Sequence, residues 1–242
     1  ITIDADNQKL VLSGKAVAKE VAVEERNHKI SMIVPGSVME GVVESLMPYG
    51  AFVSLGDGLN GLVHVPQICE RRIKKPSEVL KEGDTIKVYV AGVKESDRGP
   101  RAIISRTHPD FVKRLFEKEV PEIFDGLITI KKIVRIPGER AKVAVESYDD
   151  RIDPVGACVG VKGSRIHGIV RELKNENIDI INWTSNIQLL VQRALSPAKI
   201  SSIKVEEGRI SVWLKPGEVS LAIGKNGSNI KLASMLVGQE IE

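Results

Sequence analysis

The stretches A-C-V-G-V-K-G-S-R-I at residues 157–166 and L-A-I-G-K-N-G-S-N-I at residues 221–230 decide the fold of this chain. Each has the pattern G-x-x-G-S-x-I, follows an apolar run and opens a segment with the apolar spacing of a helix. A motif that recurs in this way indicates two copies of one structural unit. We therefore expect two related units in the second half of the chain.

The segments around both motifs predict the same order of elements, α-β-β-α-α-β. For the first copy they predict a helix at 110–120, strands at 127–136 and 141–147, helices at 154–159 and 164–173, and a strand at 178–183. For the second copy they predict a helix at 185–195, strands at 202–205 and 209–214, helices at 219–223 and 228–236, and a short strand near Ile241. We expect one α+β domain over residues 108–184 and another over residues 185–242.

Five short β-rich runs upstream predict a small antiparallel barrel over residues 37–107. The runs cover 38–46, 49–55, 61–65, 85–93 and 101–105 and are separated by turn residues, an arrangement typical of the OB fold. Residues 4–16 resemble residues 96–108 at the end of this barrel. Residues 1–36 are therefore expected to hold the last hairpin of a preceding barrel and a linker helix over 14–30.

The composition excludes several classes of protein. The chain has 242 residues, 35 Lys and Arg, 32 Asp and Glu, and two cysteines without metal-binding spacing. Charged residues interrupt every apolar stretch before the ~18 residues of a membrane helix, and neither a signal peptide nor a cofactor motif is present. We expect a monomeric cytoplasmic protein without disulfide, metal, cofactor or membrane span. The net charges of residues 1–36, 37–107, 108–184 and 185–242 are 0, +1, 0 and +2, so no segment is strongly basic.

The G-x-x-G loops are suited to bind a phosphodiester backbone. Two glycines let another backbone approach closely, and the helix after each loop directs unpaired N–H groups toward that point. A single G-x-x-G is more often an ordinary turn between helices, but two copies in one frame favour binding. The residues predicted to bind such a backbone are Gly160, Val161, Lys162, Gly163, Ser164 and Arg165 in the first copy and Gly224, Lys225, Asn226, Gly227, Ser228 and Asn229 in the second.

Both units resemble the KH domain, in which a G-x-x-G loop clamps about four nucleotides of a single strand. Apolar side chains beside the loops are candidates for the floor of a base-binding groove. They are Ile166, Ile169 and Val170 in the first copy and Ile230 and Leu232 in the second. A nucleotide-binding P-loop is excluded, because Asn226-Gly227 follows Lys225 where Ser or Thr is needed.

The barrel segment carries Y-G-A-F-V at residues 49–53 and G-L-V-H-V at residues 61–65, which resemble the S1-type RNA-binding OB fold. The resemblance implies a stacking face of Tyr49, Phe52 and His64, with Asp97 and Arg101 beside it. The cations expected to follow the phosphates are Arg71, Arg72, Lys74 and Lys75.

Strand alternation puts Tyr49 and Phe52 on opposite faces, so a shared face requires a twist or bulge at Gly50. The alternative interpretation is two half-buried barrel aromatics and a surface histidine.

No residue pattern indicates an enzyme. Cys158 stands in an apolar helix and is expected to be a core residue. The acidic residues at 149, 150 and 153 precede Pro154, where they favour a helix start and have no metal-ligand spacing. His28 and His167 have no partner that the sequence places beside them.

The order of an S1-type barrel and two KH units, together with four motifs, resembles the NusA family of bacterial transcription elongation factors. The motifs are I-S-R-T-H-P-D-F-V-K-R-L-F-E-K-E-V-P-E-I at 104–123, D-P-V-G-A-C-V-G-V-K-G-S-R-I at 153–166, L-S-P-A-K at 195–199 and S-L-A-I-G-K-N-G at 220–227. The resemblance implies a non-enzymatic factor that binds single-stranded nascent RNA at the RNA polymerase elongation complex and modulates pausing, termination and antitermination. In that family a helical N-terminal domain contacts the polymerase, and we expect no counterpart of that domain in residues 1–242.

Residues 1–93 look more like consecutive repeats of ribosomal protein S1. Two origins stay open: an unusual or truncated relative of NusA, or a hybrid of two families joined near Lys94. The alternative function is that of a ribosome-associated general RNA-binding protein. A third class, an exoribonuclease appendage of the polynucleotide phosphorylase type, has the opposite order, with one KH domain before the S1-type domain.

Overall fold

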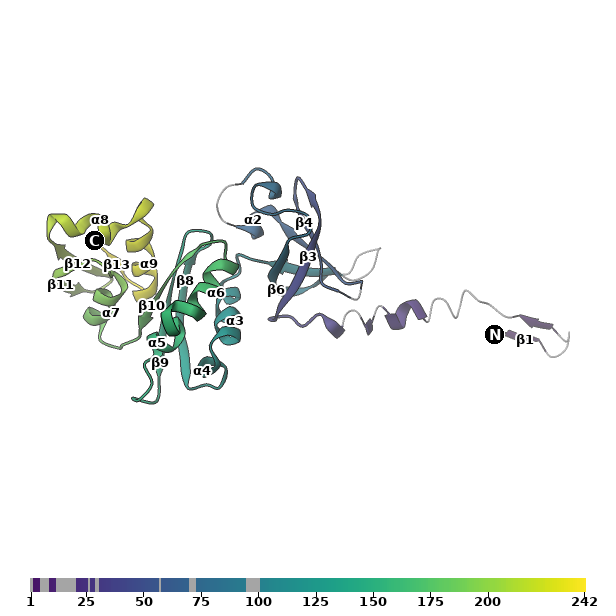
Figure 1. Cartoon of the computed structure of the whole chain (residues 1–242), viewed down its shortest axis with the longest axis horizontal. Coiled ribbons are helices and arrows are strands. Elements are labelled where there is room, and N and C mark those ends of the chain that lie inside the picture. The colour runs from purple at the N-terminus through teal and green to yellow at the C-terminus, as the bar shows by residue number, and fades with distance from the viewer. Residues whose placement is uncertain are drawn as a thin grey trace.

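The computed structural model describes residues 2–4, 9–11, 21–25, 27–28, 31–56, 58–69, 73–94 and 101–242. Within these ranges the chain forms a five-stranded barrel followed by two α/β units, which we call the first and the second repeat. Figure 1 shows the barrel, the first repeat and the second repeat in a row. The predicted fold class, a small barrel followed by two α+β units, is confirmed.

The barrel closes with its strands in the order β3-β4-β5-β7-β6. The strands are β3 (Val38–Met47), β4 (Gly50–Ser54), β5 (Asn60–His64), β6 (Thr85–Lys94) and β7 (Arg101–Ser105), and α2 (Val65–Ile68) and η1 (Pro76–Glu78) lie between β5 and β6. Apolar side chains from all five strands fill the interior. The predicted strand at 61–65 ends at His64 instead, because Pro66 stands in the first turn of α2.

The first repeat has the predicted order of elements and one additional helical turn. It contains α3 (Pro109–Glu119), α4 (Pro121–Phe124), β8 (Ile128–Ile136), β9 (Arg140–Ser147), α5 (Pro154–Val159), η2 (Val161–Gly163), α6 (Ser164–Glu172) and β10 (Asn177–Asn182). Pro121 follows the end of α3 as predicted, but it also starts α4, since proline is well tolerated in a first helical turn. The sheet has the order β10-β9-β8, and α3, α5 and α6 pack on one of its faces.

The second repeat has the same order. It contains α7 (Ile187–Ala194), β11 (Ile200–Glu206), β12 (Arg209–Leu214), η3 (Pro216–Glu218), α8 (Val219–Ile223), η4 (Lys225–Gly227), α9 (Ser228–Val237) and β13 (Glu240–Ile241). Its sheet has the order β11-β12-β13, and β13 runs parallel to β12 as β10 does to β9. The topology predicted from the repeated motif is therefore confirmed.

Helix α9 joins the two repeats, because it packs on the face of the first sheet that the helices of the first repeat leave free. The shared core contains Val134, Ala144 and Ile181 from that sheet and Leu232, Ala233 and Leu236 from α9. A continuous core of this kind holds the two loops in a fixed relation to each other.

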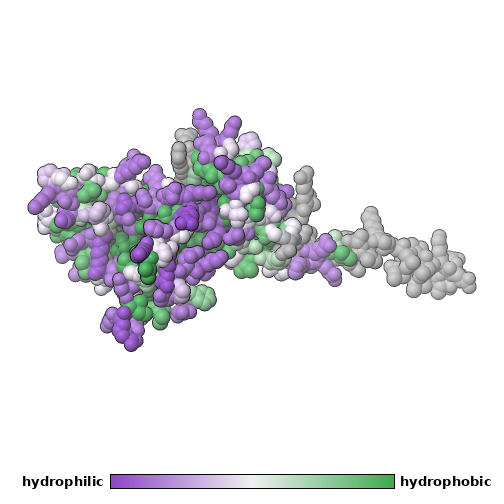
Figure 2. All heavy atoms as spheres, in the orientation of Figure 1, coloured by the Kyte–Doolittle hydropathy of each residue, from purple (hydrophilic) through white to green (hydrophobic). Residues whose placement is uncertain are grey.

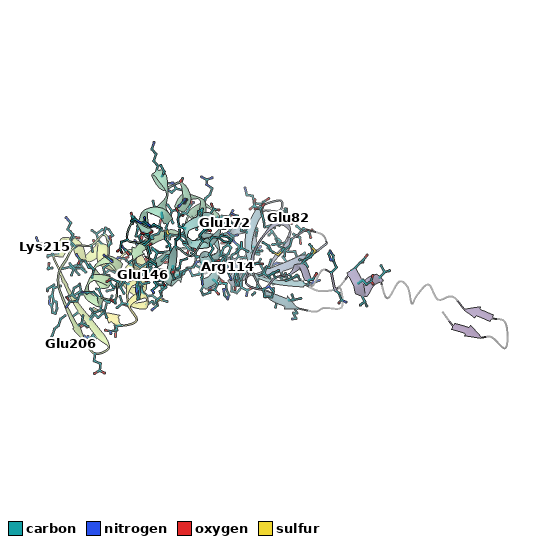
Figure 3. The ribbon with its side chains drawn as sticks, turned by 90° about the horizontal axis from the view of Figure 1, so that it is seen from below. Glu82, Arg114, Glu146, Glu172, Glu206 and Lys215 are labelled. Carbon is teal, nitrogen blue, oxygen red and sulfur yellow. The ribbon has the colours of Figure 1, made fainter. Side chains whose placement is uncertain are left out.

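Buried charged side chains join the barrel to the first repeat. Arg106 is only 4% exposed and donates to the main-chain carbonyl of Lys87 and to the carboxylate of Glu172, which Figure 3 shows at this junction. Arg135 of the first repeat donates to the main-chain carbonyl of Arg106 at 3.0 Å, and two further bonds of 2.7 and 2.9 Å pair it with the carboxylate of Glu176. Burial lowers the pKa of Arg106, although the charge of Glu172 opposes that shift. The junction is therefore a paired ionic network rather than a flexible linker.

Upstream of the barrel, β1 (Thr2–Asp4) and β2 (Lys9–Val11) form an antiparallel pair, and residues 21–25, 27–28 and 31–32 are helical. The other residues of the predicted linker helix lie outside the described ranges. The assignment of the strand pair to a preceding barrel stays a prediction. In the part of the chain that the structure describes, no helix has the length and apolar character needed to cross a membrane.

Candidate RNA interface

The two G-x-x-G loops have nearly the same backbone conformation. Gly160 and Gly224 have φ/ψ angles of 75°/171° and 74°/176°. Two positions later, Lys162 and Asn226 are left-handed, with angles of 52°/28° and 54°/25°. The region that the first glycine occupies is essentially open to glycine alone. The motif therefore determines the turn in both copies.

Close packing also requires the first glycine of each loop. A Cβ atom at Gly160 would lie 2.8 Å from Cγ of Arg165, and one at Gly224 would lie 2.6 Å from Cβ of Asn229. At Gly227, by contrast, a Cβ atom would meet open space, so only its φ of 73° favours glycine. The two glycines of one loop thus have different reasons to be there.

Arg165 and Asn229 occupy the same motif position and have the same structural task. Nη1 of Arg165 donates to the carbonyl of Ala157 at 2.7 Å, while Nδ2 of Asn229 donates to the carbonyls of Leu221 and Ala222 at 3.1 Å each. These carbonyls lie in the last turns of α5 and α8, where they have no partner inside the helix. Each side chain therefore fixes the helix that leads into its loop.

Because of this structural role, some residues that the motif predicted to contact RNA are buried. Asn229 is fully buried and Ser228 nearly so, so neither side chain lies on the surface where RNA contact was expected. Arg165 is half-buried and also bonds to the carboxylate of Glu122 at 2.9 Å, while Ser164 is exposed. Asn229 is a positioning residue, because its amide N–H groups bond to the carbonyls at the end of α8.

The tips of both loops are exposed. Val161 is 82% exposed, and Lys162, Lys225 and Asn226 are exposed as well. Helices α6 and α9 begin directly after the loops, and no side chain caps their first N–H groups. Uncapped N–H groups at a helix start attract an anion. With a lysine at each tip, the arrangement is suited to a phosphodiester.

An apolar groove of about 370 Å³ lies beside the second loop. Helix α8 lines it with Val219 and Ile223, both exposed, and α9 adds Ile230, which the sequence placed on a groove floor. Leu232 and Ile169, expected in the same role, are buried instead in the cores of the repeats. Sequence reasoning missed the two α8 residues, whose i, i+4 apolar spacing before Gly224 was the available signal.

The aromatic residues of the barrel lie close together, as predicted, but not for the predicted reason. The rings of Tyr49 and Phe52 are 6.4 Å apart in an edge-on arrangement, and the guanidinium of Arg101 lies 5.8 Å from the Phe52 ring centre. Tyr49 stands in the turn before β4, so strand alternation does not apply to it. His64 is exposed on β5 directly opposite Gly50. Phe52, in the middle of β4, and His64 therefore lie on the outer face of the β4–β5 pair, and Tyr49 lies in the turn before β4.

The other predicted barrel cations are only partly described. Lys74 is exposed, and its main-chain N–H bonds to Glu78 at 2.8 Å. Arg71, Arg72 and Asp97 lie outside the described residues. On the face of the molecule in Figure 2, hydrophilic and hydrophobic residues are intermixed over the barrel and both repeats.

The remaining residues of interest have structural roles. Cys158 is fully buried, as predicted for a core residue, and burial raises the pKa of its thiol to about 12. Asp153 caps α5 by accepting from the N–H of Val155, and Asp149 pairs with Arg151. Among the described residues, no three His, Cys, Asp or Glu side chains are placed to hold a metal ion.

Known protein families share this organisation. Residues 34–105 match the family of the S1 RNA binding domain. Residues 106–183 match the NusA-like first KH domain, and residues 187–242 match the NusA-like second KH domain. Fold and matches together define a protein built from an S1 domain and two KH domains, which are RNA-binding domains.

The curated relatives are more specific. The transcription termination/antitermination proteins NusA of Bacillus subtilis and Thermus thermophilus are 44% and 41% identical to this chain over 207 and 209 residues. Both matches cover 85% of this chain, and they cover 54% and 52% of the relatives, so the chain spans about half their length. The resemblance to the NusA family is therefore confirmed. Because these matches are longer than residues 94–242, the similarity extends into the barrel, which argues against a junction of two families near Lys94.

Proposed function

We propose that the chain is an RNA-binding transcription elongation factor of the NusA type. In this role it binds single-stranded nascent RNA and modulates pausing, termination and antitermination. The observation that carries the proposal is the pair of G-x-x-G loops with one backbone conformation, each followed by an uncapped helix start. The names of the relatives support the role in transcription. Because the chain spans about half of those proteins, its association with the polymerase is itself part of the proposal.

The proposed RNA site has three parts on three functional units, residues 37–107, 108–184 and 185–242. They are the barrel face around Phe52, the first loop, and the exposed part of the second loop. Since no unit is strongly basic, RNA is held by main-chain N–H groups, apolar grooves and a few local cations. The salt dependence of affinity should be shallow in consequence. We further propose that the protein is monomeric, has no enzymatic activity and is located in the cytoplasm.

Charge reversal at the loop tips tests the site. Val161→Asp with Lys162→Asp in one variant, and Lys225→Asp with Asn226→Asp in another, place carboxylates where a phosphate is proposed to lie. Each variant should weaken single-stranded RNA binding roughly tenfold in a fluorescence anisotropy titration. All four side chains are exposed, so the fold should survive. Lys113→Asp with Lys118→Asp on α3 is the matched control. Unchanged affinity in both loop variants would exclude the loops as the RNA site.

Pull-down and transcription assays test the role. A tagged full chain should retain RNA polymerase. In a purified transcription reaction it should change pause duration and terminator read-through, and the loop variants should leave both quantities unchanged. Retention of ribosomal subunits without polymerase would favour the alternative function of a ribosome-associated RNA-binding protein. Incubation with RNA and phosphate should release no nucleoside diphosphates, and their release would indicate a phosphorolytic activity.

A further inference from the structure

We infer that a cavity between the barrel and the first repeat is a binding site for a small carboxylate whose apolar body has the size of a single ring. We call it the junction cavity. None of the described residues that line it belongs to the proposed RNA site. The inference therefore goes beyond the proposed function, because it assigns a small-molecule ligand to a separate part of the protein.

The junction cavity has a volume of about 110 Å³, is partly open to solvent and has walls from both units. The barrel side contributes Ile68, Val79 and Leu80, and the first repeat contributes Pro137 and Leu173. A closed cavity of about 150 Å³ can hold benzene, so a partly open one of this size accepts a ring with a substituent at the mouth. Clefts between domains with mostly apolar walls and a few polar groups are common ligand sites.

The charged groups of the cavity wall favour an anion. Among the described residues they are Arg106, Arg135, Lys174 and Glu176. The buried carboxylate of Glu176 already accepts two bonds from Arg135 and one of 2.9 Å from the N–H of Gly138, so its charge is neutralised within the wall. Lys174 is exposed and forms no ion pair with another described residue. Its ammonium group is therefore free to bind a carboxylate at the mouth of the cavity.

The two arginines give a second reason for an anion. Their guanidinium groups lie 5.5 and 6.0 Å from the centre of the same ring, that of Phe111, so two like charges stand close together. Burial lowers the pKa of Arg106, the charge of Glu172 (Figure 3) opposes that shift, and the charge of Arg135 adds to it. A carboxylate in the adjoining cavity would offset the repulsion between the two arginines.

Lys174 has a backbone conformation that is costly for lysine. It follows the last turn of α6 with a φ of 56°, and its N–H bonds back to the carbonyl of Arg171 at 3.1 Å. Glycine is the usual residue at this position of a helix end. Among the described residues, four other than glycine have a positive φ: Lys162 and Asn226 at the loop tips, Lys174 and Asn175. Such strain is typical of functional sites, and here it places a cation where glycine would relieve it.

A titration of the full chain with benzoate, followed by amide NMR, tests the inference. Benzoate combines one ring with a carboxylate, and it should bind with a Kd on the order of 1 mM, as expected for so few atoms. The amide signals of Leu80 on the barrel side and of Lys174 on the repeat side should both shift. Benzyl alcohol has the ring without the charge and should bind roughly tenfold more weakly.

Two glycine substitutions separate the charge of Lys174 from its strain. Lys174→Gly removes the ammonium group and relieves the positive φ, so it should weaken benzoate binding roughly tenfold while raising the melting temperature by about 2 °C. Asn175→Gly is the matched control, because Asn175 also has a positive φ, 68°, but does not line the cavity. It should leave the affinity for benzoate unchanged. Val79→Phe fills the cavity from the barrel side and should abolish binding, and thermal unfolding checks that each variant is folded.

Each contrary outcome overturns a defined part of the inference. Equal affinity of the two glycine variants for benzoate would exclude Lys174 as the anion ligand. Equal affinity of the unaltered chain for benzoate and benzyl alcohol would mean that the cavity does not select an anion. Shifts confined to amides away from the cavity, or full binding by a folded Val79→Phe variant, would exclude the junction cavity as the site. Since none of these measurements involves RNA, the proposed function would stand in every case.

Discussion

The two repeats present nearly identical loops on sheets that meet different neighbours. The φ and ψ angles of equivalent loop residues agree within 5°, although Lys162 and Asn226 at the tips differ in chemistry. The glycines act locally, so the loop forms in the same way wherever the motif stands. Whether a helix of another repeat packs on the far face of the sheet depends instead on the size of the side chains on that face.

Equivalent positions on the two sheets show this dependence. The pairing of β9 with β10 begins at Arg140, and that of β12 with β13 begins at Arg209. Ala144 and Trp213 each stand four residues further along, so they are equivalent positions on the two sheets. Ala144 is fully buried under α9, whereas Trp213 is 51% exposed. A small residue lets a helix of the next repeat approach the sheet, and a large one in the same place leaves that face open.

Substitutions at these two positions should have very different effects on stability. Ala144→Trp inserts an indole where α9 packs and should lower the free energy of unfolding by about 3 kcal/mol, the upper range for overpacking. Trp213→Ala changes an exposed side chain and should cost about 0.5 kcal/mol or less. Urea unfolding of both variants measures the difference. Equal losses would show that packing of α9 on the first sheet does not depend on residue size.

The glycines of the second loop sharpen the comparison within one motif. Gly224→Ala places a Cβ atom against buried Asn229 in a region of φ and ψ that alanine avoids, and should cost about 2 kcal/mol. Gly227→Ala meets open space and should cost about 1 kcal/mol, for its positive φ alone. Unfolding midpoints of the two variants test the order. A larger loss at Gly227 would contradict the packing argument.

The positioning residues should differ by their burial. Asn229→Ala leaves the carbonyls of Leu221 and buried Ala222 without their donor and should cost about 1.5 kcal/mol. Arg165→Ala removes the equivalent bond to Ala157, but this arginine is only half-buried, so water can replace the donor and the cost should be smaller. Unfolding experiments on both variants, with RNA affinity as a second measurement, check this. A greater cost for Arg165→Ala would mean that its ion pair with Glu122 stabilises the fold more than its hydrogen bond to the end of α5 does.

Local signals predicted most of the fold, while contacts between repeats escaped them. The bounds of α5, α8 and β12 agree with the predictions, because proline, glycine and apolar alternation act within a few residues. The burial of Asn229 depends on carbonyls of another helix, which no spacing reveals. The docking of α9 had one available signal: its sequence S-N-I-K-L-A-S-M-L-V has apolar residues on more than one side, as expected for a helix buried between two layers.

Cys158 gives the smallest expected effect and compares the helices before the two loops. It corresponds to Ala222 in the second repeat, and both are buried. Because burial raises the pKa of the Cys158 thiol to about 12, only about one thiol in ten thousand is a thiolate at pH 8. Iodoacetamide should therefore leave Cys158 unmodified in the folded protein and alkylate it in denaturant, as peptide mass spectrometry can show. Cys158→Ala, which copies the second repeat, should leave RNA affinity unchanged. Rapid alkylation of the native protein would mean that α5 opens frequently, and the two loops would then differ in stability despite their common conformation.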